Sequence, residues 1–134
     1  MNDKKKIDKT DEEWTAQLSD AAYAVCRKSA TEPPFSGEYN FNKVSGSYKC
    51  VCCDSALFDS GKKFESGSGW PSFWGISEGA DVELLPDNSH GMVRTEVICS
   101  RCRAHLGHVF EDGPQPTGDR FCINSVALKF DPSE

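Results

Sequence analysis

Two short cysteine motifs have the spacing of metal-binding turns. Cys50 and Cys53 stand in CxxC spacing in "KCVCCDS", and Cys99 and Cys102 repeat it in "ICSRCRA". Each such turn can direct two thiolates at one ion, so two turns complete the tetrahedral set of a structural zinc site. Four thiolates leave no position for a bound water, which predicts one zinc ion per chain that braces the fold. Four ordinary buried cysteines are the alternative.

Cys122 has the neighbours of a reactive thiol. In "GDRFCINSVALKF", residues 118–130, Arg120 and Asn124 lie two positions before and after it. A regular strand would carry all three side chains on one face, at the polar start of an otherwise apolar segment. Neighbouring groups that favour the thiolate turn a cysteine into a nucleophile. We therefore expect a site here, the alternative being a cysteine that packs as a small hydrophobe.

Other residues are placed to complete a pocket around this thiol. His105 and His108 follow the second cysteine turn in "HLGHVF", and from there we expect both side chains to converge on one pocket. Trp70 stands in "SGSGWPSFW", where two glycines and a proline predict a rigid loop that presents the indole as a pocket wall. An aromatic core residue and satisfied polar histidines are the competing interpretations.

The elements that must position these residues follow from caps and periodicity. Thr10 and Glu13 form a capping-box pattern, and apolar residues at helical spacing predict two short helices over residues 11–28. Two adjacent prolines then predict an extended arm through "TEPPFSGEY". From residue 41 onward, short β-favouring runs alternate with Gly, Pro, Asp and Ser, which predicts mostly antiparallel β structure.

One hairpin is expected within the β region. The stretch "GMVRTEVIC" alternates apolar and polar residues as a half-exposed strand does, with Arg94 and Glu96 on the polar side. Residues 82–85 are expected to pair with it through a turn at residues 87–91.

The composition describes one acidic domain over residues 1–134. Its 15 Lys and Arg against 21 Asp and Glu give a net charge of −6, the wrong sign for gripping nucleic-acid phosphates or anionic lipid. No run approaches the roughly 20 apolar residues of a membrane span, and "MNDKKKIDKTDEEW" lacks the apolar stretch of a signal peptide. We therefore expect a cytoplasmic protein, monomeric by default, that binds neither nucleic acid nor membrane.

The cysteine count and the expected elements suggest how this domain is organised. Seven cysteines, an odd number, favour reduced thiols used for metal or redox chemistry. We expect residues 1–10 to be frayed, residues 11–40 to form the helical segment and arm, and residues 41–134 to form a zinc-containing β core.

Taken in order, the motifs resemble those of the methionine-(R)-sulfoxide reductases, the B-type methionine sulfoxide reductases. The resemblance covers nearly the whole chain through "TEPPFSGEY", "YKCVCC", "GWPSF", "RTEVICSRC", "HLGHVF" and "RFCINS". It implies a mainly β fold of two antiparallel sheets, a β-tent, with a short helical N-terminal segment and a structural zinc site. It also implies thiol-dependent reduction of methionine (R)-sulfoxide, in proteins or peptides, to methionine.

The resemblance further implies a role for each site residue. Cys122 would be the nucleophile that becomes a sulfenic acid as methionine leaves. Trp70 would pack on the methyl group of the substrate, and Arg120 would affect the electrostatics of the site. Three polar side chains would hold or polarise the sulfoxide: His105, His108 and Asn124.

The chain departs from a common family pattern at the resolving cysteine. Many members carry that cysteine where this chain has Ser68. Our hypothesis is that Cys26, in "YAVCRKSATEPPF", resolves the sulfenic acid to a disulfide that thioredoxin, the family's usual reductant, then reduces. Cys52 and an external thiol are the alternatives. A disulfide requires Cα atoms within about 7 Å of each other.

Two questions of function stay open at this point. The sequence leaves open whether free or protein-bound sulfoxide is preferred. The alternative to an enzyme is a zinc-stabilised module that binds a ligand or protein in an aromatic pocket.

Overall fold

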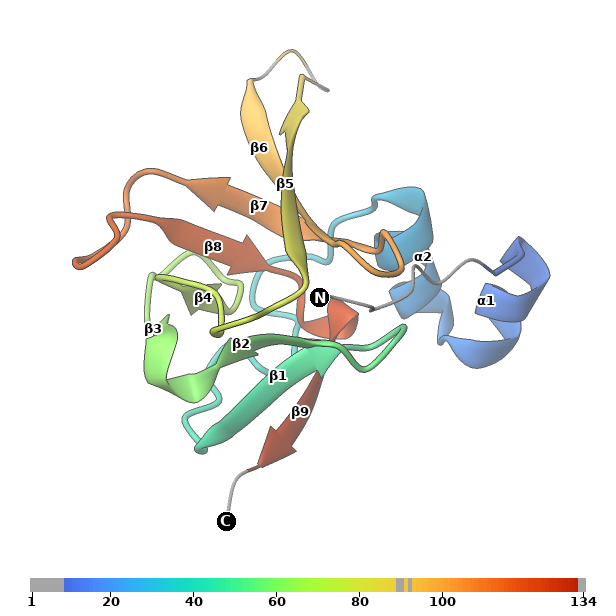
Figure 1. Ribbon diagram of the computed structural model, residues 1–134, viewed down its shortest axis with the longest axis horizontal. Coiled ribbons are helices and arrows are strands. Elements are labelled where there is room, and N and C mark those ends of the chain that lie inside the picture. The colour runs from blue at the N-terminus through green and yellow to red at the C-terminus, as the bar shows by residue number, and fades with distance from the viewer. Residues whose placement is uncertain (1–8, 89–90, 92, 133–134) are drawn as a thin grey trace.

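The computed structural model describes residues 9–88, 91 and 93–132 of the chain. Most of the expected frayed end, residues 1–8, lies outside this part, as does His90 in the expected hairpin turn. Within it, a helical segment precedes two antiparallel sheets (Figure 1). The mainly β architecture of two antiparallel sheets is the one that the resemblance implies. No helix in the described part is long and apolar enough to cross a membrane.

The N-terminal segment forms helices α1 (Asp11–Gln17) and α2 (Asp20–Lys28), which confirms the two helices expected over residues 11–28. The Thr10 hydroxyl accepts a hydrogen bond from the Glu13 N–H, and the Glu13 carboxylate accepts one from the Thr10 N–H. These bonds satisfy donors that a helix start leaves free. Helix α2 packs against strand β7 (His105–Phe110) and the 3₁₀ turn η3 (Ser125–Ala127) at the side of the sheets (Figure 1).

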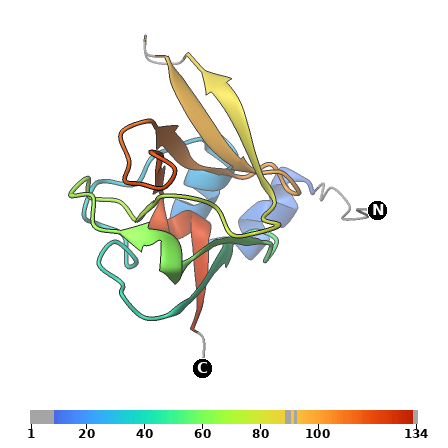
Figure 2. The same ribbon diagram turned by 60° about the vertical axis from the view of Figure 1, so that its left-hand side comes forward.

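Among the described residues, six strands form the larger sheet in the order β3-β4-β8-β7-β6-β5. Their bounds are Lys63–Phe64 for β3, Ser72–Phe73 for β4, Val82–Asp87 for β5, Arg94–Cys99 for β6, His105–Phe110 for β7 and Arg120–Ile123 for β8. The hairpin of β5 and β6 extends away from the other strands (Figure 2).

The smaller sheet has the strand order β2-β1-β9 in the described part of the chain. Its strands are β1 (Gly46–Cys50), β2 (Ala56–Asp59) and β9 (Leu128–Pro132), with one 3₁₀ turn, η1 (Ser60–Lys62), after β2. A second 3₁₀ turn, η3 (Ser125–Ala127), leads into β9 from the larger sheet.

Aromatic rings join the two sheets. Tyr48 and Phe58 come from the smaller sheet, Phe73 and Phe121 from the larger one. The Phe73 ring lies 4.5 Å from that of Phe58 and 5.1 Å from that of Tyr48, between ring centroids. Phe121 packs on Phe58 at 5.8 Å. Because buried aromatics contribute large apolar areas and specific geometry, this cluster fixes strand β8, and so the position of the adjacent Cys122.

The stretch expected as one strand, residues 118–130, forms two strands in different sheets. Strand β8 is the part of this stretch that belongs to the larger sheet. The turn η3 follows it and leads into β9, which belongs to the smaller sheet. At the turn, the Glu32 carboxylate accepts hydrogen bonds from the N–H groups of Ser125 at 2.9 Å and Val126 at 3.1 Å. Buried N–H groups must be paired, and this side chain supplies the partner that a sheet ladder would otherwise provide. The continuous strand was therefore a wrong prediction.

The expected hairpin is confirmed, since β5 pairs with β6 along its whole length. Its polar side differs from the half-exposed strand that was predicted. Arg94 and Glu96 are partly buried, with 23% and 21% of their side chains exposed, and both point to partners within the fold. Val93, expected on the apolar side, precedes the strand and is 90% exposed. The polar side chains of β6 thus contact partners inside the fold.

Candidate active site and metal centre

A cavity of about 270 Å³ lies against β7, β8 and the loop before β4. Five of the residues expected at the site line it: Trp70, His108, Arg120, Cys122 and Asn124. The structure therefore brings together side chains that lie as far as 54 residues apart in the sequence. Thr31, Ser68 and Arg94 line it as well. Thr31 and Arg94 were not singled out from the sequence.

Cys122 and His108 are direct partners across two antiparallel strands. The ladder of β7 and β8 pairs His108 with Cys122 and Gly107 with Ile123. Side chains of such a pair stand on one face with Cβ atoms about 5 Å apart. A Cβ at Gly107 would lie only 2.0 Å from the Cys122 carbonyl oxygen, so glycine is required for the strands to approach this closely. The sheet register itself therefore places a histidine beside the thiol.

The Cys122 thiol is partly buried. Burial raises its pKa above the ordinary value and outweighs the hydrogen bond from Ser68 and the charge of Arg120, which both lower it. The Ser68 hydroxyl lies 3.7 Å from the Cys122 sulfur. The Arg120 guanidinium is bound by the Asp112 carboxylate at 2.9 and 3.3 Å. Contrary to the expectation from the sequence, these neighbours leave the resting cysteine as a protonated thiol near neutral pH.

The two histidines share a face because the strand pairing is irregular. The register of β6 and β7 shifts by one residue, since Val97 pairs with Gly107 but Ile98 pairs with His105. The extra residue reverses the alternation, so His105 and His108 point the same way. Their ring centroids lie 5.5 Å apart. His105 is nevertheless buried behind His108 and is not part of the cavity lining, so only one of the two expected histidines reaches it directly.

Each histidine has a carboxylate partner from the β5–β6 hairpin. His108 Nε2 lies 2.7 Å from an Asp87 oxygen, and His105 Nδ1 lies 2.7 Å from a Glu96 oxygen. Burial lowers the pKa of His108, the Asp87 carboxylate raises it in part, and the Arg94 charge lowers it again. His108 is thus neutral near pH 7 and able to accept a proton. His105 Nε2 is buried with no hydrogen-bond partner among the described residues.

The arm before the sheets fixes two other site residues through Glu32. The Glu32 carbonyl oxygen accepts a hydrogen bond from the Trp70 indole N–H at 2.9 Å, and the Glu32 N–H donates to the Asn124 side-chain oxygen at 3.0 Å. The Asn124 amide nitrogen donates to the Leu106 carbonyl at 2.9 Å. Asn124 therefore joins the arm to β7 as well as lining the cavity. Sequence reasoning missed Glu32, because an acidic residue before two prolines carries no local sign of burial.

The remaining cysteines lie away from the cavity. All seven cysteines are free thiols, and Cys122 is the only one among the described residues that lines the cavity. Cys26 is 2% exposed on the core side of α2, and Cys52 is 5% exposed beside the cysteine turns. The arm residue that reaches the cavity is Thr31. Because Cys26 is buried and does not line the cavity, it would have to become accessible to Cys122 to resolve the sulfenic acid.

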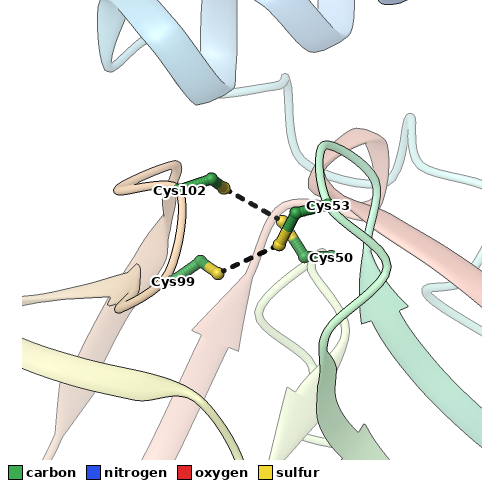
Figure 3. Close-up of side chains that lie close together, drawn as sticks. All are labelled: Cys50, Cys53, Cys99 and Cys102. Carbon is green, nitrogen blue, oxygen red and sulfur yellow. Dashed lines mark hydrogen bonds between the residues drawn. The ribbon is translucent and has the colours of Figure 1, made fainter. Parts of the chain in front are cut away.

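The four cysteines of the CxxC motifs converge as their spacing predicts. Figure 3 shows the pair from the turn after β1 facing the pair from the turn after β6. Their sulfur atoms all lie within 4.8 Å of one another, and Cys50–Cys102 and Cys53–Cys99 are each 3.6 Å apart. Four sulfurs bound at about 2.3 Å to one tetrahedral zinc would lie about 3.8 Å apart. The donors, their number and their spacing fit a structural zinc ion.

The two cysteine turns have the same backbone design. Residue Asp54 donates its N–H to the Cys50 carbonyl at 2.8 Å, and Arg103 donates to the Cys99 carbonyl at 2.8 Å. Both donors adopt a positive φ, 68° and 66°. Two matching turns hold two thiols each at a fixed separation, so a metal ion would bind without rearranging the backbone.

Comparison with known proteins found a family model and several relatives that match most of the chain. The family model of the SelR domain matches residues 18–132. The chain is 58% identical over 129 residues to the peptide methionine sulfoxide reductase MsrB of Pseudomonas putida (strain W619), covering 96% of this chain and 97% of that protein. It is 59% identical over 129 residues to the protein of the same name from Pseudomonas entomophila (strain L48), covering 96% and 98%. The corresponding protein of Hahella chejuensis (strain KCTC 2396) is 54% identical over 125 residues, covering 93% and 90%.

Proposed function

The chain belongs to the MsrB family of peptide methionine sulfoxide reductases, and we propose that Cys122 is the nucleophile with which it reduces methionine (R)-sulfoxide. The observation that carries this assignment is the cavity in which Cys122 faces His108 across two strands beside Trp70. As a member of this family the protein is a thiol-dependent oxidoreductase.

The thiol and the histidine divide the proton transfers of the reaction. At rest both groups are neutral, because burial raises the pKa of Cys122 and lowers that of His108. His108 takes the thiol proton as the Cys122 sulfur attacks the sulfoxide sulfur, and then gives it to the departing oxygen. The hydroxyl then moves to the Cys122 sulfur as the substrate S–O bond and the new S–S bond break, which leaves a sulfenic acid that carries the thiol proton and releases methionine as the two-electron-reduced product.

The shape of the cavity favours one sulfoxide epimer. The Trp70 indole is held as an apolar wall by its hydrogen bond to the arm, and it takes the methyl group of the substrate. His108 and the Asn124 amide offer polar groups for the oxygen on another side. His105 acts behind them by packing on the His108 ring and fixing its orientation. Because methyl and oxygen have separate places, exchange of the two would put the oxygen against the indole, so the site would discriminate between the epimers, and the resemblance implies that the accepted one is the R form.

Regeneration requires that the sulfenic acid meet a second thiol. Our hypothesis remains that Cys26 forms this disulfide and that thioredoxin reduces it, with Cys52 or an external thiol as the alternatives. Titration of thiols after one turnover decides between them, using the wild type and Cys26→Ser. A Cys26→Ser variant that still forms an intramolecular disulfide contradicts the role of Cys26.

A zinc ion would stabilise the fold and would take no part in the reaction. Its ligands would be Cys50, Cys53, Cys99 and Cys102. A structural site of this kind stabilises a domain by about 10 kcal/mol or more. The ion would join the turn after β1 to the turn after β6, and thereby the smaller sheet to the larger one. That the protein is a cytoplasmic monomer that binds neither nucleic acid nor membrane stays an expectation from the sequence.

The deciding experiment is a single-turnover assay with each sulfoxide epimer. Reduced wild-type protein is expected to release one methionine per chain from the R form in the absence of a reductant, and far less from the S form. Cys122→Ser is expected to release none, because a serine hydroxyl cannot take the oxygen. A zinc-stabilised binding module would hold the sulfoxide without releasing methionine, and that result would overturn the proposal.

A further inference from the structure

Two exposed aromatic rings stack beside the loop that carries Trp70. The side chains of Phe35 and Phe41 are 60% and 64% exposed. Their ring centroids lie 6.2 Å apart with the planes inclined by 28°. A single exposed phenylalanine is ordinary, but adjacent aromatic side chains that stay exposed are typical of interaction surfaces. We call these two rings the aromatic pair.

The exposed position of Phe35 is held by the backbone. Its φ is 65°, in the left-handed region that a bulky side chain rarely adopts. The Phe35 N–H donates to the Gly69 carbonyl at 2.7 Å, which holds the residue in this conformation. Strained residues of this kind persist where the surrounding structure fixes them, and they gather at functional sites. The backbone conformation of the arm therefore holds the Phe35 ring in an exposed position.

The aromatic pair lies on the outer side of the cavity wall. Gly69 has a φ of 94°, and a Cβ built on it would lie 3.1 Å from two atoms of the Phe35 ring. Its two chain neighbours, Ser68 and Trp70, both line the cavity. One short loop thus has the cavity on one side and the Phe35 ring on the other. The Phe35 ring therefore lies next to the loop that forms part of the cavity wall, and Phe41 stacks on it.

The cavity takes one side chain and leaves the rest of a peptide outside. Its volume of about 270 Å³ is below the roughly 300–1,000 Å³ of pockets that hold drug-sized molecules. The residues that flank a methionine sulfoxide must therefore lie on the surface around the mouth. A second hollow that meets the cavity at Ser68 and Arg120 is lined by charged groups, including Glu65 and Asp112. The aromatic pair offers an exposed apolar surface beside the same loop.

We propose that Phe35 and Phe41 bind an apolar side chain next to the methionine sulfoxide of an extended peptide substrate. Methionine is an apolar residue of protein interiors, so its chain neighbours in an opened segment are often apolar as well. Two aromatic rings offer such neighbours a flat apolar surface with little loss of conformational entropy. The inference rests on the proposed function and adds the class of peptide on which it acts.

The test compares three substrates that share one methionine (R)-sulfoxide. Two are peptides that differ only in having Leu or Ser beside it, and the third is the N-acetylated amino acid. The wild type is expected to show a kcat/KM about five- to tenfold higher for the Leu peptide than for the Ser peptide. Phe41→Ser is expected to abolish this preference, and Phe35→Asn is expected to do the same while tolerating the positive φ.

Controls separate this inference from the proposed function. Leu84→Ser removes an apolar side chain that is 49% exposed on β5, and it is expected to keep the wild-type preference. Phe41→Ser is decisive because the backbone bond to Gly69 belongs to Phe35. An unchanged preference in Phe41→Ser overturns the docking role. A wild type that releases no methionine from any of the three substrates instead overturns the proposed function.

Discussion

Removal of the Glu32 carboxylate should loosen the site and the fold together. Glu32 is 6% exposed, and its two oxygens accept hydrogen bonds from the Ser125 and Val126 N–H groups at 2.9 and 3.1 Å. A hydrogen bond to a charged group contributes about 1.5–3 kcal/mol, and a buried donor left unpaired costs a similar amount. The Ser125 N–H is buried, while half-buried Val126 can regain water. Glu32→Ala should therefore lower the free energy of unfolding by about 4 kcal/mol, a large part of the roughly 5–15 kcal/mol of a typical domain.

Urea denaturation of the reduced protein measures this change, with Glu38→Ala as the matched control. Glu38 lies in the same arm, carries the same charge and is exposed, so its loss should change stability by less than about 0.5 kcal/mol. Glu32→Gln keeps the shape and one acceptor oxygen, and should lose about half as much as Glu32→Ala. Because the Glu32 backbone also holds Trp70 and Asn124, kcat/KM should fall in folded Glu32→Ala by about tenfold. A loss below about 1 kcal/mol in Glu32→Ala refutes the argument that this carboxylate locks the arm.

Three further outcomes follow from the site and the metal centre. In Asp87→Asn the pKa of His108 should fall, because the Asp87 carboxylate raises it in the wild type. The acid limb of the pH profile of kcat/KM should then move to lower pH, while the alkaline limb, assigned to the Cys122 thiol, stays in place. An unmoved acid limb contradicts the proton role of His108. Ser68→Cys should place a second sulfur close to Cys122, because the Ser68 hydroxyl oxygen lies 3.7 Å from the Cys122 sulfur. One turnover should then convert both thiols to a disulfide, which thiol titration and mass spectrometry detect. Two thiols left free contradict this geometry. Strong chelation of the wild type should release one zinc ion per chain, measured with a chromogenic chelator, and Cys99→Ser should weaken its binding. Either change should lower the melting temperature by more than about 10 °C. Full stability without metal contradicts a structural site.

The parts of the structure that were predicted from the sequence have local causes. A CxxC turn fixes its two thiols within four residues, so the four-cysteine cluster followed from spacing alone. The helices followed from the capping box of Thr10 and Glu13 and from apolar residues at helical spacing, which act within a turn or two. The β5–β6 hairpin followed from alternation and a polar turn. In each case the residues that decide the structure are neighbours in the chain.

The parts that were missed depend on partners far away in the chain. The break between β8 and β9 is stabilised by Glu32, which lies more than 90 residues before the N–H groups that it accepts. Asp87 falls in the expected turn and Glu96 on the polar side of the expected strand, and only the pairing of distant strands brings them to the histidines. The irregular register is also what lets His105 pack behind His108. A period-two pattern contains no information about which strand lies next to it.

The burial of Cys122 bears on its proposed role as the nucleophile. A protonated thiol is a poor nucleophile, so the raised pKa of Cys122 limits its reaction with other electrophiles. His108, its cross-strand partner, is itself held neutral by burial and can accept the proton when a substrate occupies the cavity. Burial disfavours a separate thiolate–imidazolium pair, so in the proposed mechanism the proton leaves Cys122 only as its sulfur bonds to the substrate. Gly107 is what allows the two strands to bring Cys122 and His108 together.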